Sequence, residues 1–143
     1  MYRVLKPGGI IGIRDVDYGG YLFAPDDETF GRGKAIFEAD WENVGGHPRI
    51  GRQLGGLFYE TGFIHVKVTA SFEVHNDVES RRFYAQSING MFSSADFIKR
   101  LTESGLSTIE EIDAIKDAAL KWQEAPGAIV AIPHCEAIGR KAE

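Results

Sequence analysis

The order of the apolar patterns along the chain constrains the fold more than any other feature of the sequence. Residues 9–16 (GIIGIRDV) form a short β-branched run, which predicts a buried strand. Residues 63–74 (FIHVKVTASFEV) alternate between apolar and polar side chains, which predicts a second strand. Two apolar runs, 128–132 and 135–138, predict a last strand with a bend at Pro133. Helical patterns separate these strands, so we expect an α/β fold in a single domain, residues 1–143.

Two helices are expected between the first two strands. Asp26 or Asp27 is suited to cap a helix that ends at the glycine pair Gly45-Gly46. Pro48 suits the first turn of the next helix, which ends at Gly62.

Residues 76–126 have the character of a helical insertion. A helical stretch runs to about Gly90, and Ser93 or Ser94 is placed to cap a second one. The clearest helix opens at Ser107, whose spacing to Glu110 is that of a capping box. It ends at the Pro126-Gly127 pair.

Composition excludes several classes of protein. With 43% hydrophobic and 26% charged residues, the 143-residue chain has the profile of a soluble globular domain. A net charge of −5 argues against nucleic acid as a partner. No apolar run reaches the roughly 20 residues of a membrane helix. The single cysteine, Cys135, cannot form an internal disulfide, which favours a cytoplasmic location.

No motif identifies a metal site or a catalytic nucleophile, so the catalytic residues are unknown at this stage. The four histidines lack metal-ligand spacing: His47, His65, His75 and His134. Gly31-Arg32-Gly33 approaches a dinucleotide fingerprint, but it lacks the third glycine and falls inside a predicted helix.

The carboxyl end of the first strand is the best candidate for a substrate site. Asp15, Asp17 and Tyr18 follow this strand, and open α/β sheets bind their ligands at such strand ends. The alternative is that the two carboxylates cap the loop or pair with Arg14.

Two further sets of residues are candidates for substrate binding. Arg49 and Arg52 are three apart on one predicted helix face and could hold an anion, although such pairs are often simply solvated. Phe83, Tyr84 and Phe92 could form an apolar lid, and they would look the same as residues of ordinary helix packing.

Three segments resemble class I S-adenosylmethionine-dependent methyltransferases. Residues 2–9 (YRVLKPGG) resemble the R-V-L-K-P-G-G turn that leads into the family's fifth strand. Residues 52–63 resemble its last helix, with the closing Gly-Phe turn, and residues 128–141 resemble its seventh strand. The resemblance implies a partial Rossmann-like fold, with a three-stranded mixed sheet in the family order 5-7-6.

The family's acidic, glycine-rich cofactor turn lies upstream of the R-V-L-K-P-G-G segment and has no counterpart here. The resemblance therefore implies the C-terminal portion of a methyltransferase, without cofactor-binding residues of its own. In the complete enzyme a methyl group would pass from S-adenosylmethionine to a small molecule, and the isolated chain is expected to be inactive. The alternative is a non-catalytic module, derived from a methyltransferase, that binds an apolar small molecule or forms oligomers.

The resemblance also implies a partner chain. The strand at residues 9–16 would become an open sheet edge, which is a liability unless another chain covers it. We therefore expect a homo-oligomer, such as a homodimer, or a chain that supplies the missing N-terminal half. Residues 76–126 lie where the family carries helices that cover the substrate, so this insertion is a candidate lid.

Overall fold

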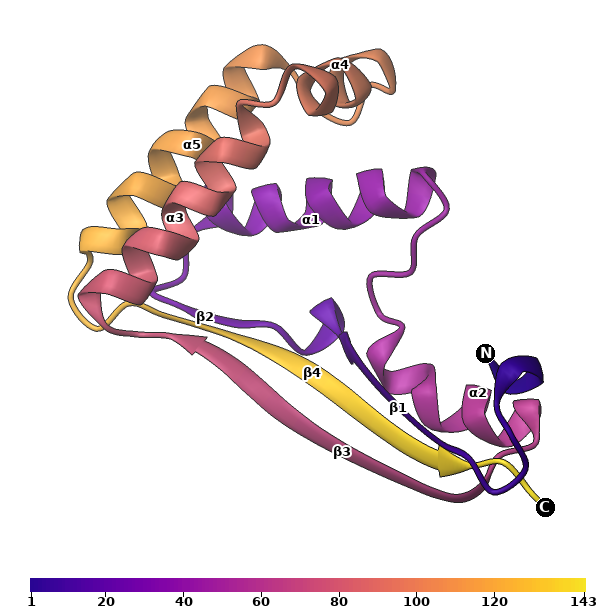
Figure 1. The fold of residues 1–143 in the computed structure, drawn as a ribbon. Coiled ribbons are helices and arrows are strands. Elements are labelled where there is room, and N and C mark those ends of the chain that lie inside the picture. The colour runs from indigo at the N-terminus through magenta and orange to yellow at the C-terminus, as the bar shows by residue number, and fades with distance from the viewer. The chain divides into compact units, whose positions relative to one another are not determined.

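The computed structural model describes residues 1–143, and it has the α/β character predicted from the sequence (Figure 1). Its strands are β1 (Ile10–Val16), β2 (Leu22–Ala24), β3 (Ile64–His75) and β4 (Ile129–Arg140). Its α-helices are α1 (Glu28–Asn43), α2 (Leu54–Thr61), α3 (Val78–Phe92), α4 (Ala95–Glu103) and α5 (Ile109–Glu124). Three short 3₁₀ turns complete the elements: η1 (Tyr2–Val4), η2 (Tyr18–Gly20) and η3 (Gly51–Gln53). None of the helices combines the length and the apolar character that a bilayer-spanning segment requires.

The chain divides into two compact units. The first unit comprises residues 1–21, 48–73 and 132–143, and the second comprises residues 22–47 and 74–131. The predicted helical insertion, residues 76–126, forms α3, α4 and α5 and belongs to the second unit together with α1. Strands β3 and β4 contribute residues to both units.

β4 is the strand with which all the others pair. β1 pairs with it in antiparallel register, from Ile10 opposite Arg140 to Val16 opposite His134. β2 pairs with the beginning of β4, and β3 runs against β4 in the opposite direction (Figure 1). The sheet is therefore antiparallel and four-stranded, not mixed and three-stranded. β2 escaped prediction because three residues are too few to show a periodicity.

In the first unit, α2 covers one face of the sheet. Leu54 and Phe58 of this helix form a buried cluster with Phe63 and with Ala137 of β4. A Cβ at Gly139 would come within 2.8 Å of the Phe58 ring, so glycine allows the helix to approach β4 this closely. The cluster is the core of this unit.

β1 is half-buried rather than fully buried as predicted. Ile11 and Ile13 pack against the cluster under α2, whereas the intervening side chains point to the opposite face. On that face Ile10 is 58% exposed, because no helix of this unit covers it.

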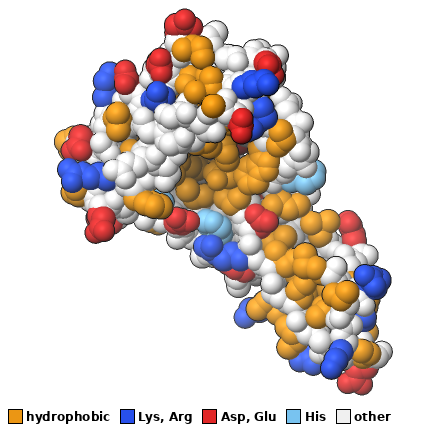
Figure 2. Space-filling view, turned by 45° about the horizontal axis from the view of Figure 1, so that its top comes forward, with side chains coloured by type: hydrophobic (Ala, Val, Ile, Leu, Met, Phe, Trp, Pro, Cys, Tyr) orange, Lys and Arg blue, Asp and Glu red, His pale blue; other side chains and the backbone are white.

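In the second unit the core lies among α1, α3, α4 and α5. The residues with no or almost no exposure are Ile36, Phe92, Leu101, Ile112 and Ile115. Hydrophobic side chains also reach the surface of both units (Figure 2).

The helix caps agree with the sequence at some positions and differ at one. Asp27 caps α1, and Gly62 ends α2 with a positive φ of 92°, as predicted. The cap of α5 is Thr108, whose hydroxyl accepts from the backbone N–H of Glu111. The predicted cap, Ser107, donates instead to the Glu111 carboxylate at 2.7 Å. Both hydroxyls precede the helix, and the backbone geometry selects Thr108.

Candidate functional site

The loop that follows β1 holds a carboxylate, Asp17, that is only 4% exposed. Arg52 binds it in a bidentate manner, with Nε donating to Oδ2 at 2.6 Å and Nη2 donating to Oδ1 at 2.8 Å. The backbone N–H groups of Arg52 and Gly19 also donate to the two carboxylate oxygens, both at 3.0 Å. These contacts, the Arg52 side chain first, lower the pKa of Asp17 below its usual value.

Two glycines make room for this ion pair. A Cβ at Gly51 would lie 2.9 Å from the Val16 carbonyl oxygen and 3.0 Å from the Cβ of Asp17. A Cβ at Gly19 would overlap the Arg52 guanidinium. The η3 turn can therefore approach the end of β1 only because both positions lack side chains.

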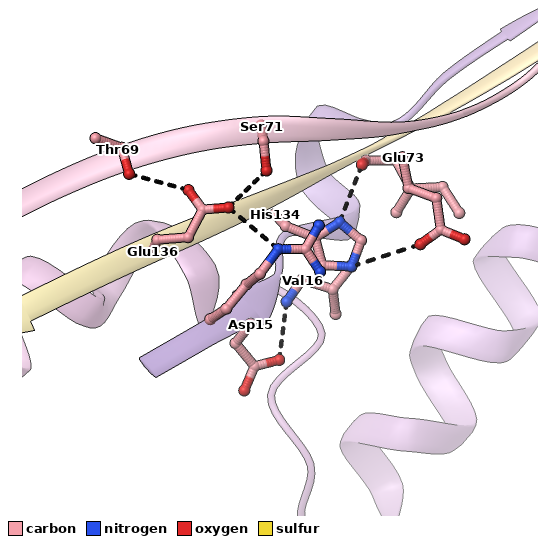
Figure 3. A network of polar contacts seen from close by, with 9 residues as sticks. Asp15, Val16, Thr69, Ser71, Glu73, His134 and Glu136 are labelled. Carbon is pink, nitrogen blue, oxygen red and sulfur yellow. Dashed lines mark hydrogen bonds and ion pairs between the residues drawn. The ribbon is translucent and has the colours of Figure 1, made fainter. Parts of the chain in front are cut away.

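The other predicted residues of this loop have more local contacts. The backbone N–H of Tyr18 donates to the Pro48 carbonyl at 2.9 Å, and the Tyr18 ring lies 6.4 Å from the ring of Tyr21. Asp15 accepts a hydrogen bond from the adjacent backbone N–H of Val16 at 2.8 Å (Figure 3). The carboxylate of Asp15 thus stabilises the end of its own strand.

The predicted pairing of Arg49 and Arg52 on one helix face is wrong. Arg49 lies in the turn before η3, because helical structure begins only at Gly51. Arg52 reaches Asp17, and its side chain remains 55% exposed. Its guanidinium has N–H groups beyond the two that contact Asp17, so its outer edge can still bind an anion.

A second polar cluster spans three strands of the same unit (Figure 3). The carboxylate of Glu136 on β4 accepts from Ser71 Oγ at 2.5 Å and Thr69 Oγ1 at 3.1 Å, both on β3. It also accepts from Arg14 Nε on β1 at 3.1 Å. The hydrogen bond from the Ser71 side chain is the main reason that the pKa of Glu136 is lowered. The cluster joins the three strands on the face opposite α2.

His134 and Glu73 extend this cluster along the same face. His134 Nε2 lies 3.9 Å from Glu73 Oε2 (Figure 3). Sequence reasoning missed the whole cluster, because only the pairing of β3 with β4 brings these distant positions together. No group of three or more His, Cys, Asp or Glu side chains is arranged to hold a metal ion.

Cys135 follows His134 but points to the α2 side of the sheet, where it packs against the core cluster. Burial, and then the Asp17 carboxylate, raises the pKa of its thiol. The thiol is therefore poorly suited to act as a nucleophile at neutral pH.

In the second unit, Tyr84 belongs to an aromatic cluster. Its ring centroid lies 5.0 Å from that of His75 and 5.9 Å from that of Trp122. Trp122 stacks on Phe30 at 5.4 Å, and its Nε1 donates to the carbonyl oxygen of Ala24 at 2.9 Å. Tyr84 thus packs between His75, at the end of β3, and Trp122 of α5.

The other two predicted lid residues differ sharply in exposure. Phe83 is 63% exposed on α3, with its ring 6.4 Å from that of His75. Phe92 is 1% exposed and meets Phe97 edge-on at 5.2 Å inside the helical core. Phe92 is therefore a packing residue and not part of a ligand-facing lid.

Gly31-Arg32-Gly33 does not form a loop that could hold S-adenosylmethionine. The nearest approach to a glycine-rich cofactor loop, Gly31-Arg32-Gly33, lies within α1. A Cβ at Gly33 would come within 2.6 Å of Ile115, so this glycine serves the packing of α1 against α5. It does not present backbone N–H groups to a ligand.

No protein-family model and no curated protein matches the chain. Among solved structures, the chain is similar to phospholethanolamine N-methyltransferase 2 of Haemonchus contortus, in complex with phosphomonomethylethanolamine and S-adenosylhomocysteine. The sequence identity is 16% and the TM-score is 0.37. The match covers 99% of this chain but 28% of the other, so the chain spans little more than a quarter of that structure's length.

Proposed function

We propose that this chain is the acceptor-binding portion of a class I S-adenosylmethionine-dependent methyltransferase. In the complete enzyme, a methyl group would be transferred from S-adenosylmethionine to a small molecule that carries an anionic group. The observation that carries the proposal is the contact between Arg52 and Asp17 at the carboxyl end of β1. The R-V-L-K-P-G-G resemblance of residues 3–9, directly before β1, supports it. In the family's numbering β1, β4 and β3 would be strands 5, 7 and 6.

Arg52 is the residue to which we assign the anionic group of the acceptor. Its guanidinium is already held in place by Asp17, so little side-chain freedom remains to be lost when a ligand binds. Asp17 itself is unsuited to act as a general base, because its oxygens accept four hydrogen bonds and its pKa is lowered. We therefore assign Asp17 as a positioning residue. Tyr18, the next residue, is the remaining candidate for acceptor contact.

The cofactor site belongs, in this proposal, to residues of the complete enzyme outside this chain. Gly31-Arg32-Gly33 does not fit that role, and the chain has no acidic, glycine-rich turn. The chain alone is accordingly expected to be inactive. Its proposed contribution is to bind and orient the acceptor.

A second candidate is a non-catalytic module that binds an apolar small molecule. The observation in its favour is Phe83, a large aromatic side chain that is 63% exposed beside His75. The DNA upstream of Met1 separates the two candidates. An in-frame acidic, glycine-rich turn supports the methyltransferase, whereas an adjacent in-frame stop codon supports the module.

Calorimetric titration of the purified chain tests the acceptor site directly. We expect inorganic phosphate to bind to the wild type and to bind at least about tenfold more weakly to Arg52→Gln. Arg14→Gln, which removes an exposed arginine on the other face of the sheet, is the matched control and should bind as the wild type does. Equal binding by the wild type and Arg52→Gln would overturn the assignment of Arg52.

The same instrument tests the location of the cofactor site. S-adenosylhomocysteine should not bind to this chain up to millimolar concentration. Micromolar binding would show a cofactor site within these residues, and it would contradict the assignment of that site to the rest of the enzyme.

A further inference from the structure

β3 has an edge to which no strand of this chain is paired (Figure 1). The strand is twelve residues long, contains no proline, and every residue from Lys67 to Val74 is exposed. Val68 and Phe72 are 49% and 53% exposed on the side that faces α2. An exposed edge of this length is a template for another strand, and proteins usually protect such edges.

The sequence of β3 is complementary to itself. If two copies of the strand are laid antiparallel about Ala70, Lys67 of each copy lies opposite Glu73 of the other. The same register places Val68 opposite Phe72. Each of these contacts occurs twice, because the two copies are related by a two-fold axis at Ala70.

In this register each face of the strand lies beside a face of the same character on the second copy. The even-numbered residues are apolar: Val66, Val68, Ala70, Phe72 and Val74. The odd-numbered residues are charged or hydroxyl-bearing: Lys67, Thr69, Ser71 and Glu73. A shift by two residues in either direction would remove the pairing of both lysines with glutamates. Opposite charges and apolar pairs across strands stabilise a sheet, so the register about Ala70 is the favoured one.

We propose that β3 is a dimer interface, on which a second copy of this chain adds its own β3 in antiparallel register about Ala70. The inference does not depend on the proposed acceptor site. It also moves the expected homo-oligomer contact away from β1. The two charged residues of β1, Arg14 and Asp15, are adjacent and point to opposite faces, so no two-fold antiparallel register of two β1 strands pairs them.

The backbone limits the length of this interface. His65 has a positive φ of 53°, which is not a strand conformation and interrupts the regular ladder at the beginning of β3. The regular part therefore extends over residues 66–75, and Ala70 lies next to its midpoint. The symmetry axis given by the charges thus lies close to the centre of the regular strand.

Charge exchange tests the register in sedimentation equilibrium. The wild type should be a dimer, and Lys67→Glu and Glu73→Lys should each raise the dissociation constant at least about tenfold. The double variant Lys67→Glu/Glu73→Lys should restore dimerisation, because both ion pairs form again with their signs exchanged. Lys99→Glu on the exposed side of α4 is the control for the change in net charge and should leave the dimer unaffected.

A cross-linking experiment locates the axis independently of these charges. Ala70→Cys should form an intermolecular disulfide rapidly on mild oxidation, since directly opposed Cβ atoms lie roughly 4.5–5.5 Å apart. Ser71→Cys should form it far more slowly, because the two copies of residue 71 are diagonal neighbours. A wild type that stays monomeric at high concentration would overturn the proposal. So would a dimer that ignores the single charge changes, or equal cross-linking at positions 70 and 71.

Discussion

Two parallel hydrogen bonds join the exposed side chain of Arg52 to the buried side chain of Asp17. The Asp17 side chain is 5% exposed, whereas the Arg52 side chain is 55% exposed. Removal of Arg52 would leave a buried carboxylate with two backbone donors, and removal of Asp17 would leave a solvated cation. The two changes therefore have different consequences. Arg52→Gln is expected to change both ligand binding and the stability of the loop, whereas Asp17→Asn tests the stability of the loop.

Asp17→Asn is expected to lower the free energy of unfolding by about 2 kcal/mol at pH 7, because it removes charge-assisted hydrogen bonds at a buried position. Urea unfolding followed by circular dichroism measures the change. Asp26→Asn, in an exposed loop, is the matched control and should differ little from the wild type. Equal stabilities of the two variants would mean that the carboxylate of Asp17 contributes nothing to the fold.

The stability of the protein should fall in acid, and Asp17 should account for part of that fall. Hydrogen bonds from Arg52 lower the pKa of Asp17 in the folded state below its usual value. Its contribution is therefore fully present above about pH 5 and is lost as the pH falls through the folded-state pKa. The lowered pKa values of Asp77 and Glu111 act in the same direction.

Urea unfolding at pH 7, 5 and 3 measures this dependence. The decrease in unfolding free energy between pH 5 and pH 3 should be smaller for Asp17→Asn than for the wild type. Asp26→Asn should follow the wild type. An unchanged decrease in Asp17→Asn would contradict the assignment of the lowered pKa to this residue.

The sequence predicted those features that depend on neighbouring residues. Asp27 caps α1, and Gly62 ends α2, because each acts on the backbone within one turn of itself. The alternation of residues 63–74 likewise predicted β3. In contrast, β2 has only three residues and gains its strand geometry by pairing with β4.

The candidate site could be predicted only in part. Asp17 and Arg52 were each singled out, but their ion pair joins positions 35 apart and depends on two glycines that make room for it. Sequence reasoning paired Arg52 with Arg49, because a continuous helix from Pro48 was expected. The cluster around Glu136 was missed altogether, since β3 and β4 must pair before Thr69 and Ser71 reach it.

The N-cap of α5 is Thr108 and not Ser107 as the sequence predicted, and this difference can be tested. Thr108→Ala should lower the unfolding free energy by about 1 kcal/mol, because its hydroxyl accepts the backbone N–H of Glu111. Ser94→Ala is the matched control: Ser94 caps α4 without any side-chain hydrogen bond and should be nearly neutral. Thermal or urea unfolding distinguishes the two. A larger effect at Ser94 than at Thr108 would contradict the observed caps.

Phe92 and Phe83 test the division between core and surface in the second unit. Phe92→Ala should lower the unfolding free energy by about 3–5 kcal/mol, because it removes a fully buried ring and leaves a cavity. Phe83→Ala should change it by at most about 0.5 kcal/mol, since that ring is largely exposed. Similar losses in the two variants, measured by urea unfolding, would mean that Phe83 is buried in solution.

His65 is the one non-glycine residue with a positive φ, at 53°, and its replacement tests whether that conformation is strained. The left-handed region costs an L-residue about 1–2 kcal/mol, whereas the added flexibility of glycine costs roughly 0.5–1 kcal/mol. The difference favours glycine, so His65→Gly should raise the unfolding free energy by about 0.5–1 kcal/mol. His65→Val should lower it below the wild-type value, because a β-branched side chain is least compatible with this φ. Urea unfolding gives both values, and a valine variant as stable as the glycine variant would show that residue 65 is extended in solution.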